Sequence, residues 1–315
     1  MLFRSRRTLE QAAALGIVGL VDFEFSGGAA EWIERWESGC DLLHVRMAVY
    51  AEGLDAVLAA GLRTGDPLAG DPRLTMGPLK IISDGSLNTR TAWCCEPYAD
   101  GPPERRGQPN LDEAELRRLL STAREHGLEV ATHAIGDAAA AAALEAYALT
   151  GARGSIEHAQ LLQPRDVQRL GALGLRASVQ PAHLLDDRDL AERVWPDRTA
   201  HCFPFAALLD AGADLRLGSD APVSPLDPWL AIAAAVHRSA DDRDPWHPEH
   251  ALTVRQALRA STDGVVEVRA GGPADVVLVE ADPLAVHPDA AGAAALRAMP
   301  VALTVAAGRI VHRAC

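Results

Sequence analysis

Short apolar segments alternate along most of the chain with segments whose apolar residues recur at helical spacing. Such alternation predicts parallel strands joined by crossover helices. The segments expected to form strands are 17–23, 43–50, 79–84, 128–134, 154–158, 175–180 and 215–220. The segments expected to form helices, several of which begin at Asp or Pro and end near Gly, are 112–126, 137–149, 164–173, 205–213 and 227–239.

Polar residues fall at the carboxyl ends of many of the predicted strands. They are Lys80, His133, His158, Gln180 and Asp220. An open doubly wound sheet gathers its site at one switch point, whereas a barrel gathers it from all strands at one rim. Because only seven strand–helix units are present and a closed barrel needs eight, we predict an α/β fold of the (β/α)8-type TIM barrel with one strand absent.

The pattern changes after Ser261. Short apolar runs at 274–279 and 301–311, separated by turn residues, predict two or three strands of a small β module. We therefore expect a hydrolase-type barrel at 1–262 and a small β-sandwich-like module at 263–315. The stretch 98–110, rich in Gly and Pro, is expected to be a long loop over the mouth of the barrel.

Composition narrows the class of protein. Hydrophobic residues make up 48% and charged residues 23% of the chain, and the net charge is −13, so we expect a soluble globular protein without a nucleic-acid or membrane partner. Uncharged stretches such as 12–21 are too short for a membrane span. Five cysteines without a framework spacing indicate reduced thiols and a cytoplasmic location.

Two histidines and one aspartate carry the predicted chemistry. His133, His158 and Asp220 end three different strands, so in a barrel they converge on one mouth as ligands suited to Zn²⁺ or a similar divalent ion. Lys80 ends an earlier strand and is the only lysine among 30 basic residues. Its amine can add CO₂ to give a carbamate whose two oxygens can bridge two metals, provided that burial lowers its pKa; the site would hold one or two ions. A metal-activated hydroxide would then attack a carbonyl, with Asp220 and Lys80 as catalytic residues and Asp220 carrying the proton to the leaving amine.

Five further residues are candidates for substrate binding, namely Asp84, Arg90, Trp93, Gln180 and His183. Two of them have an alternative role: Asp84 in Ser83-Asp84-Gly85-Ser86 also suits a turn, and His183 also suits a loop cap. We expect the segments around Trp93 and from 183 to 189 to be loops that shape the substrate site. The pair His247 and His250 is discounted as a metal motif, because Pro248 interrupts the helix that such a pair would need.

These residues lie in stretches that resemble the amidohydrolase superfamily, specifically the amidohydrolase-3 group that includes N-substituted formamide deformylases and YtcJ-like proteins. The matching stretches, which together span nearly the whole chain, are 79–92, 132–137, 155–162, 177–181, 217–228, 274–279 and 282–284. The resemblance implies a metal-dependent hydrolase of non-peptide C–N bonds that acts on a small amide-type substrate. By matching position, Lys80 would be the carboxylated lysine, His133 and His158 metal ligands, and Asp220 both ligand and proton shuttle.

The chain departs from that family in one respect. The family carries a His-x-His pair on its first barrel strand, and no His-x-His occurs in this sequence. The periodicity indicates that one strand is absent, and the resemblance indicates that the His-x-His motif is absent. We therefore infer that the absent strand is the one that carries this motif in the family. Three interpretations follow: an active metal-dependent amidohydrolase that uses the remaining ligands, a truncated or degenerate barrel without activity, or a chain whose true start lies upstream of Met1. The resemblance and the exposed barrel edges also suggest a homodimer.

Overall fold

The computed structural model describes residues 2–25, 28–241, 243–265 and 267–314. Its main feature is a curled sheet in the order β1-β2-β4-β5-β6-β7-β8, in which all neighbours are parallel. A short strand, β3, forms an antiparallel hairpin with β4. The strands of this sheet are β1 (Gly19–Asp22), β2 (His44–Val49), β3 (Pro67–Leu68), β4 (Asp71–Ile82), β5 (Val130–Ala134), β6 (Gly154–His158), β7 (Arg176–Val179) and β8 (Asp214–Leu217).

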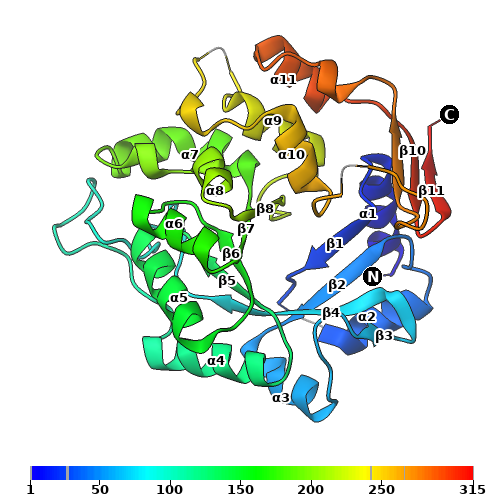
Figure 1. The fold of residues 1–315 in the computed structure, drawn as a ribbon, viewed down its shortest axis with the longest axis horizontal. Helices are drawn as coiled ribbons and strands as arrows, with labels where there is room; N and C mark the ends of the chain where they lie inside the picture. The colour runs from blue at the N-terminus through cyan, green and yellow to red at the C-terminus, as the bar shows by residue number, and fades with distance from the viewer. Residues whose placement is uncertain (1, 26–27, 242, 266, 315) are drawn as a thin grey trace.

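Helices lie around the outside of this sheet (Figure 1). Side chains cap several of them, for example Asp112, which accepts a hydrogen bond from the Glu115 amide at the start of α4. The helices are α1 (Leu2–Ala14), α2 (Gly28–Glu37), α3 (Ala51–Ala59), α4 (Glu113–Glu125), α5 (Asp137–Thr150), α6 (Pro164–Ala172), α7 (Pro181–Val194), α8 (Phe205–Asp210), α9 (Pro228–His237), α10 (Val254–Ser261) and α11 (Ala290–Arg297). Three short 3₁₀ helices cover Thr199–His201, Pro248–His250 and Pro283–Ala285.

The sheet is open between β1 and β8. Within the described ranges, β1 pairs only with β2 and β8 pairs only with β7. The structure therefore shows an α/β fold with a curled half-barrel of parallel strands, and each of the seven predicted strands overlaps one of its members. The sequence predicted a barrel that lacks one strand, and the described sheet is likewise not closed, because its two edges remain without a partner strand.

A second, three-stranded sheet follows α10. It has the order β11-β10-β9 and is antiparallel. Its strands are β9 (Val276–Val279), β10 (Val301–Ala306) and β11 (Arg309–Arg313). This sheet packs against α1, where the buried Thr304 hydroxyl donates to the Ala13 carbonyl oxygen at 2.7 Å, so the two ends of the described chain lie side by side (Figure 1). The predicted β strands of the C-terminal region are thus present.

One predicted loop is a helix. The segment 183–189 was expected to be a loop, but it lies inside α7, Pro181–Val194. Pro181 occupies the first turn of this helix, where a missing N–H costs nothing and the fixed φ favours helix formation. Leu184, Asp187 and Ala191 are buried on one face of α7. The stretch 98–110, in contrast, contains neither helix nor strand, as expected.

The described residues include no helix long and apolar enough to cross a membrane. The main hydrophobic core lies between the sheet and its helices. Tyr147 of α5 is fully enclosed in this core. Its hydroxyl donates to the carbonyl oxygens of Val130 at 2.9 Å and Ser155 at 3.2 Å, and lies 3.1 Å from Thr132 Oγ1. One phenol thus joins the adjacent strands β5 and β6, which carry His133 and His158.

Replacement of Tyr147 by Phe should lower the free energy of unfolding by about 1–3 kcal/mol, because buried partners lose their hydrogen bond without a large change in volume. Urea unfolding monitored by circular dichroism measures this change. Leu149→Ala serves as the control on the same helix, since Leu149 is exposed and should change stability by less than about 0.5 kcal/mol. Equal stability of the wild type and Tyr147→Phe would contradict the prediction.

The start of β4 is fixed by an ion pair with a pH-dependent contribution. Asp71 accepts hydrogen bonds from Arg73 at 2.7 Å and from the Trp36 indole at 3.2 Å. These bonds, above all the one from Arg73, lower the pKa of Asp71 to about 2. Because the folded-state pKa lies below the unfolded value of about 3.9, the stabilisation is complete above pH ~5 and is lost as the pH falls towards 2.

Asp71→Asn should therefore destabilise the protein by about 1–2 kcal/mol at pH 6, and the difference from the wild type should shrink as the pH is lowered to 3. Denaturant unfolding at several pH values in this range tests the expectation. Glu104→Gln, at an exposed site, is the matched control and should leave the pH profile unchanged. A difference that is independent of pH would show that the ionised carboxylate of Asp71 is not the stabilising group.

Candidate metal centre

The parallel register brings the polar strand ends together at one rim. Lys80 lies opposite Ala131, and Ile82 opposite His133. One strand further on, Ala134 lies opposite His158. The side chains that the sequence placed at separate strand ends are therefore neighbours, and the rings of His133 and His158 meet edge to face with centroids 4.5 Å apart.

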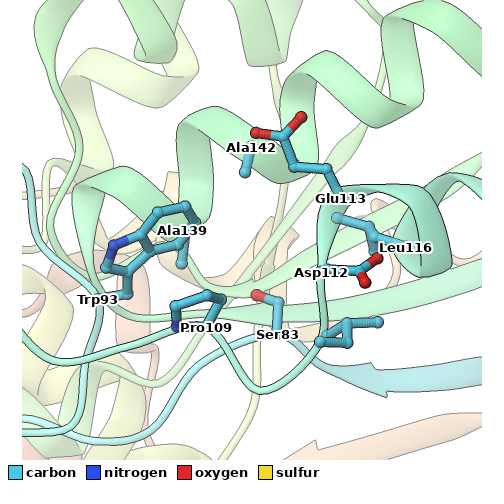
Figure 2. A pocket seen from close by; sticks show the side chains of 9 residues that line it. Ser83, Trp93, Pro109, Asp112, Glu113, Leu116, Ala139 and Ala142 are labelled. Carbon is cyan, nitrogen blue, oxygen red and sulfur yellow. The ribbon is translucent and has the colours of Figure 1, made fainter.

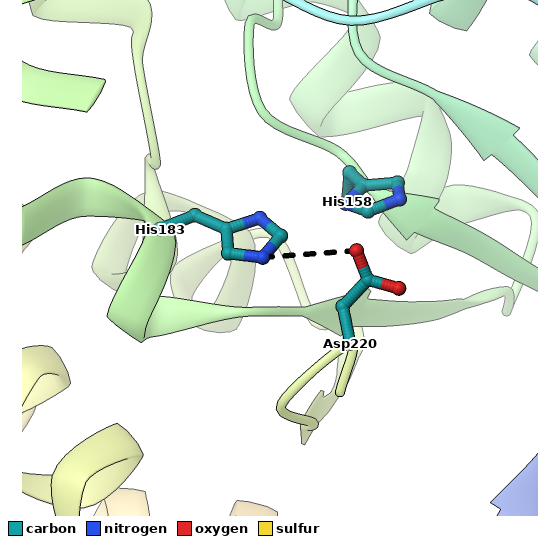
Figure 3. A group of neighbouring side chains, drawn as sticks. All are labelled: His158, His183 and Asp220. Carbon is teal, nitrogen blue, oxygen red and sulfur yellow. Dashed lines mark ion pairs between the residues drawn. The ribbon is translucent and has the colours of Figure 1, made fainter. Parts of the chain in front are cut away.

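Three side chains at this rim form a group with the composition of a metal site. They are His158 at the end of β6, His183 in the first turn of α7 and Asp220 after β8, and one potential ligand atom of each lies within 4.8 Å of the others. Figure 3 shows the carboxylate of Asp220 directed between the two imidazole rings. His183 Nε2 lies 3.7 Å from Asp220 Oδ2, and the two rings are stacked with centroids 5.7 Å apart.

The backbone is strained where it delivers two of these side chains. His158 has φ +70° and the next residue, Ala159, has φ +46°, while Asp220 has φ +58°. Left-handed conformations are costly for side chains with a Cβ and persist where the surroundings impose them, often at functional sites. Here they turn the chain at the ends of β6 and β8 so that both side chains face the same space.

Burial sets the ionisation of this group. The enclosed position of His158 lowers its pKa well below the usual value, and the charges of His133 and Lys80 act in the same direction. The imidazole is therefore neutral, which is the form that binds metals. Desolvation raises the pKa of Asp220, although nearby His183 and Lys80 oppose this effect. The Asp220 side chain is 41% exposed, so it remains reachable from solvent.

The donor set fits a divalent cation of the zinc type. His158 Nδ1 and His183 Nε2 are buried nitrogens without a hydrogen-bond partner, and a buried polar atom left unpaired carries a free-energy cost. Two imidazoles and one carboxylate are the ligands of many catalytic zinc sites. Ligand atoms about 2.1 Å from one ion lie at most about 4.2 Å apart, so the observed grouping needs only a small contraction to share an ion.

Lys80 lies next to this group in a closed environment. Its side chain is buried, and this burial lowers the pKa of the amine, against the opposing charges of Glu157 and Asp220. The ammonium nitrogen lies 4.7 Å from the centroid of the Phe23 ring. Glu157 is itself buried and accepts a hydrogen bond from the Ser155 hydroxyl. Glu157 was not among the residues predicted from the sequence, where the only signal for it is its spacing of two from Ser155, which places both on one face of the strand.

Asp84 orients the rim rather than facing the three-residue group. Its fully buried carboxylate accepts hydrogen bonds from the amides of Trp93 at 2.9 Å, Ile135 at 3.1 Å and Gly136 at 2.9 Å. At Gly136 only glycine fits, because an added Cβ would lie 1.9 Å from the Trp93 carbonyl oxygen. The same carboxylate lies 3.3 Å from His133 Nε2, which is also 3.2 Å from the Gly85 carbonyl oxygen, so the Nε2 side of the His133 ring is held by two oxygens.

The remaining predicted residues occupy different positions. The Arg90 guanidinium forms an ion pair with Asp100 at 2.8 Å, so this side chain is engaged within the loop region that carries it. Gln180 is buried at the start of α7, with its Oε1 unpaired. Trp93 lines a separate pocket of about 230 Å³ (Figure 2), to which none of the three grouped residues contributes. That pocket is lined by Ser83, Trp93, Pro109, Leu111, Asp112, Glu113, Leu116, Ala139 and Ala142.

The predicted ligand set and the observed group overlap without being identical. His158 and Asp220 belong to both, whereas Lys80 and His133 are close neighbours of the group. His183, expected to bind substrate or cap a loop, takes the third place. The signal that finds it is Pro181, since a helix that begins immediately after a parallel strand presents its first turn at the carboxyl-end rim.

Comparison with known proteins agrees with this geometry. A family model described as "Amidohydrolase family" matches residues 4–312. The protein YtcJ of Bacillus subtilis is 33% identical over 259 residues, which are 76% of this chain and 48% of YtcJ. The N-substituted formamide deformylase of Arthrobacter pascens is 26% identical over 66% of this chain and 41% of its own length.

Among solved structures, an uncharacterized metal-dependent hydrolase from Pyrococcus horikoshii superposes with a TM-score of 0.72 at 32% identity. The match covers 84% of this chain and 54% of that protein. The chain thus spans about half the length of the relatives that it matches. With a family match over nearly its whole length, a parallel half-barrel and a rim of histidine and carboxylate side chains, the chain belongs to the amidohydrolase family.

Proposed function

We propose that this chain is a metal-dependent hydrolase of amide-type C–N bonds, with a divalent cation, most simply Zn²⁺, held by His158, His183 and Asp220. The observation that carries the proposal is the convergence of these three side chains, with two buried nitrogens unpaired. The family match and the metal-dependent hydrolase among the structural relatives support it. A cation at this position would lower the pKa of a coordinated water and polarise a substrate carbonyl.

The residues of the chain divide the remaining work. Asp220 is the carboxylate with solvent access, so it is suited to accept a proton from the attacking water and to deliver it to the leaving nitrogen. His158 is neutral because burial lowers its pKa, and it therefore provides a lone pair rather than a competing positive charge. His133, held by Asp84, lies beside it and can act as a further ligand. Gln180 brings an unpaired Oε1 to the same rim, where a substrate N–H can donate to it.

Lys80 is proposed to carry a carbamate. Its neutral amine nitrogen would form a bond to the carbon of CO₂, while one C=O electron pair moves to oxygen and the amine releases a proton to solvent. Burial of the amine favours this reaction because it lowers the pKa of Lys80. The carbamate adds a negative charge near Glu157, and the two negative groups repel each other. A bound cation would offset this repulsion.

Purified wild-type protein should contain about one equivalent of zinc or should bind it when it is added. His158→Ala and His183→Ala should each weaken zinc binding by more than about 100-fold, since even loss of an outer-shell partner typically costs about 10–100-fold. Elemental analysis and calorimetric titration measure this. His126→Ala removes an exposed histidine at the end of α4 and should leave binding unchanged. Folded wild-type protein that binds no zinc would favour the alternative of a barrel without catalytic activity.

The carbamate is tested separately with ¹³C-labelled bicarbonate. Zinc-loaded wild-type protein should show a carbamate carbon resonance, and Lys80→Arg should not, because a guanidinium does not deprotonate to attack CO₂. Arg106→Lys, which introduces a lysine at a partly exposed position, is the control for labelling of any lysine. A resonance of equal intensity in Lys80→Arg would exclude Lys80 as the site of modification.

A further inference from the structure

Two residues behind the proposed metal centre are buried, polar and bonded to each other. Gln160 follows His158 by two positions, and Asp187 follows His183 by four. Gln160 is 1% exposed and Asp187 is 7% exposed. Gln160 Nε2 donates to Asp187 Oδ2 at 2.8 Å. Each partner of this hydrogen bond therefore lies a short chain distance from a different member of the metal group.

The position of Asp187 follows from helix geometry. His183 and Asp187 are four residues apart in α7, and residues at this spacing lie one above the other on the same helix face. Asp187 therefore lies on the same face of α7 as His183. Among the residues that the structure describes, no arginine, lysine or histidine nitrogen forms an ion pair with Asp187, so the Gln160 amide is the polar contact that anchors this carboxylate.

The position of Gln160 follows from the turn at the end of β6. The left-handed residues His158 and Ala159 direct the following chain away from the strand, towards α7. The Gln160 carbonyl oxygen accepts from the Phe203 amide at 2.7 Å, and the Leu161 amide donates to the Ile135 carbonyl oxygen at 3.1 Å. Hydrogen bonds thus fix the backbone around Gln160. Its side chain, bonded to Asp187, connects α7 to this fixed segment.

We propose that Gln160 and Asp187 are positioning residues of the metal centre, a clasp that joins the turn after His158 to α7 and so sets the separation of the His158 and His183 rings. The proposal rests on the proposed metal centre. Without the clasp, His183 is held only through α7, whose first turn begins at Pro181 next to the rim. Small changes in the tilt of α7 would then move His183 away from Asp220, which lies 3.7 Å from its Nε2.

The neighbouring pair Gln163 and Asp137 provides a matched control. Gln163 Nε2 donates to Asp137 Oδ2 at 2.6 Å, so this is also an amide–carboxylate bond from the same connecting segment. It joins the segment to the start of α5 rather than to α7, and neither residue adjoins a member of the metal group. Loss of this bond removes a similar interaction without altering the relation between His158 and His183.

The test measures Zn²⁺ affinity by calorimetry and the visible absorption of Co²⁺-substituted protein, which reports coordination geometry. Gln160→Ala and Asp187→Ala should each raise the dissociation constant about 10- to 100-fold and shift the Co²⁺ spectrum. The double variant should be no weaker than the worse single variant, because both remove one bond. Asp187→Asn keeps an acceptor oxygen for Gln160 and should stay within about 3-fold of the wild type. Gln163→Ala should bind like the wild type.

Thermal unfolding of the metal-free variants separates positioning from folding, since Gln160→Ala and Gln163→Ala should show losses of similar size. Unchanged zinc affinity in Gln160→Ala, or equal weakening in Gln160→Ala and Gln163→Ala, would overturn the clasp while leaving the metal centre intact. Equal weakening in Asp187→Asn and Asp187→Ala would also overturn it, because charge and not the hydrogen bond would then be responsible. Absence of zinc binding in the wild type would reject the metal centre and the clasp together.

Discussion

The parallel pairing of β4 through β8 is the constraint on which the rest of the structure depends. Because all these strands run in the same direction, every one of them ends at the same rim. Residues that are far apart in the sequence, such as His158 and Asp220, therefore become neighbours without any long-range recognition between their side chains. The helices outside the sheet, joined to it by buried contacts such as those of Tyr147, keep the strand ends aligned.

Burying the polar groups of the rim costs free energy. The hydrogen bonds that offset this cost are distributed unevenly among these groups. The Asp84 carboxylate is satisfied by three backbone amides, so it acts as a fixed hydrogen-bond acceptor that organises the turn around His133. His158 and His183, in contrast, keep buried nitrogens without partners. Completed hydrogen bonding around Asp84 and incomplete bonding at the two histidines separate the supporting part of the rim from the part prepared to receive a ligand.

The open edges of the sheet affect the site as well as the fold. β1 and β8 lack a second neighbour in the described chain, and Asp220 lies just after β8. It is accordingly the most exposed member of the metal group, at 41% for its side chain. On the opposite side, Phe23 follows β1, and its ring lies beside the Lys80 side-chain nitrogen. The enclosed half of the rim, around His158, and the accessible half, around Asp220, thus follow directly from which strands have partners.

The sequence by itself determined the strands, the parallel α/β class and the expectation of an incomplete barrel, and it identified His158 and Asp220 as candidates, because apolar periodicity and residue type are local properties. It also singled out Lys80 as a metal ligand and Asp84 as a candidate for substrate binding or for a turn. Only the tertiary structure decided that 183–189 is helical, that His183 joins the metal group and that Asp84 binds backbone amides. Pro181 marks where α7 begins, but the meeting of His183 with Asp220 and the bonds of Asp84 depend on contacts between residues distant in sequence, which no local pattern encodes.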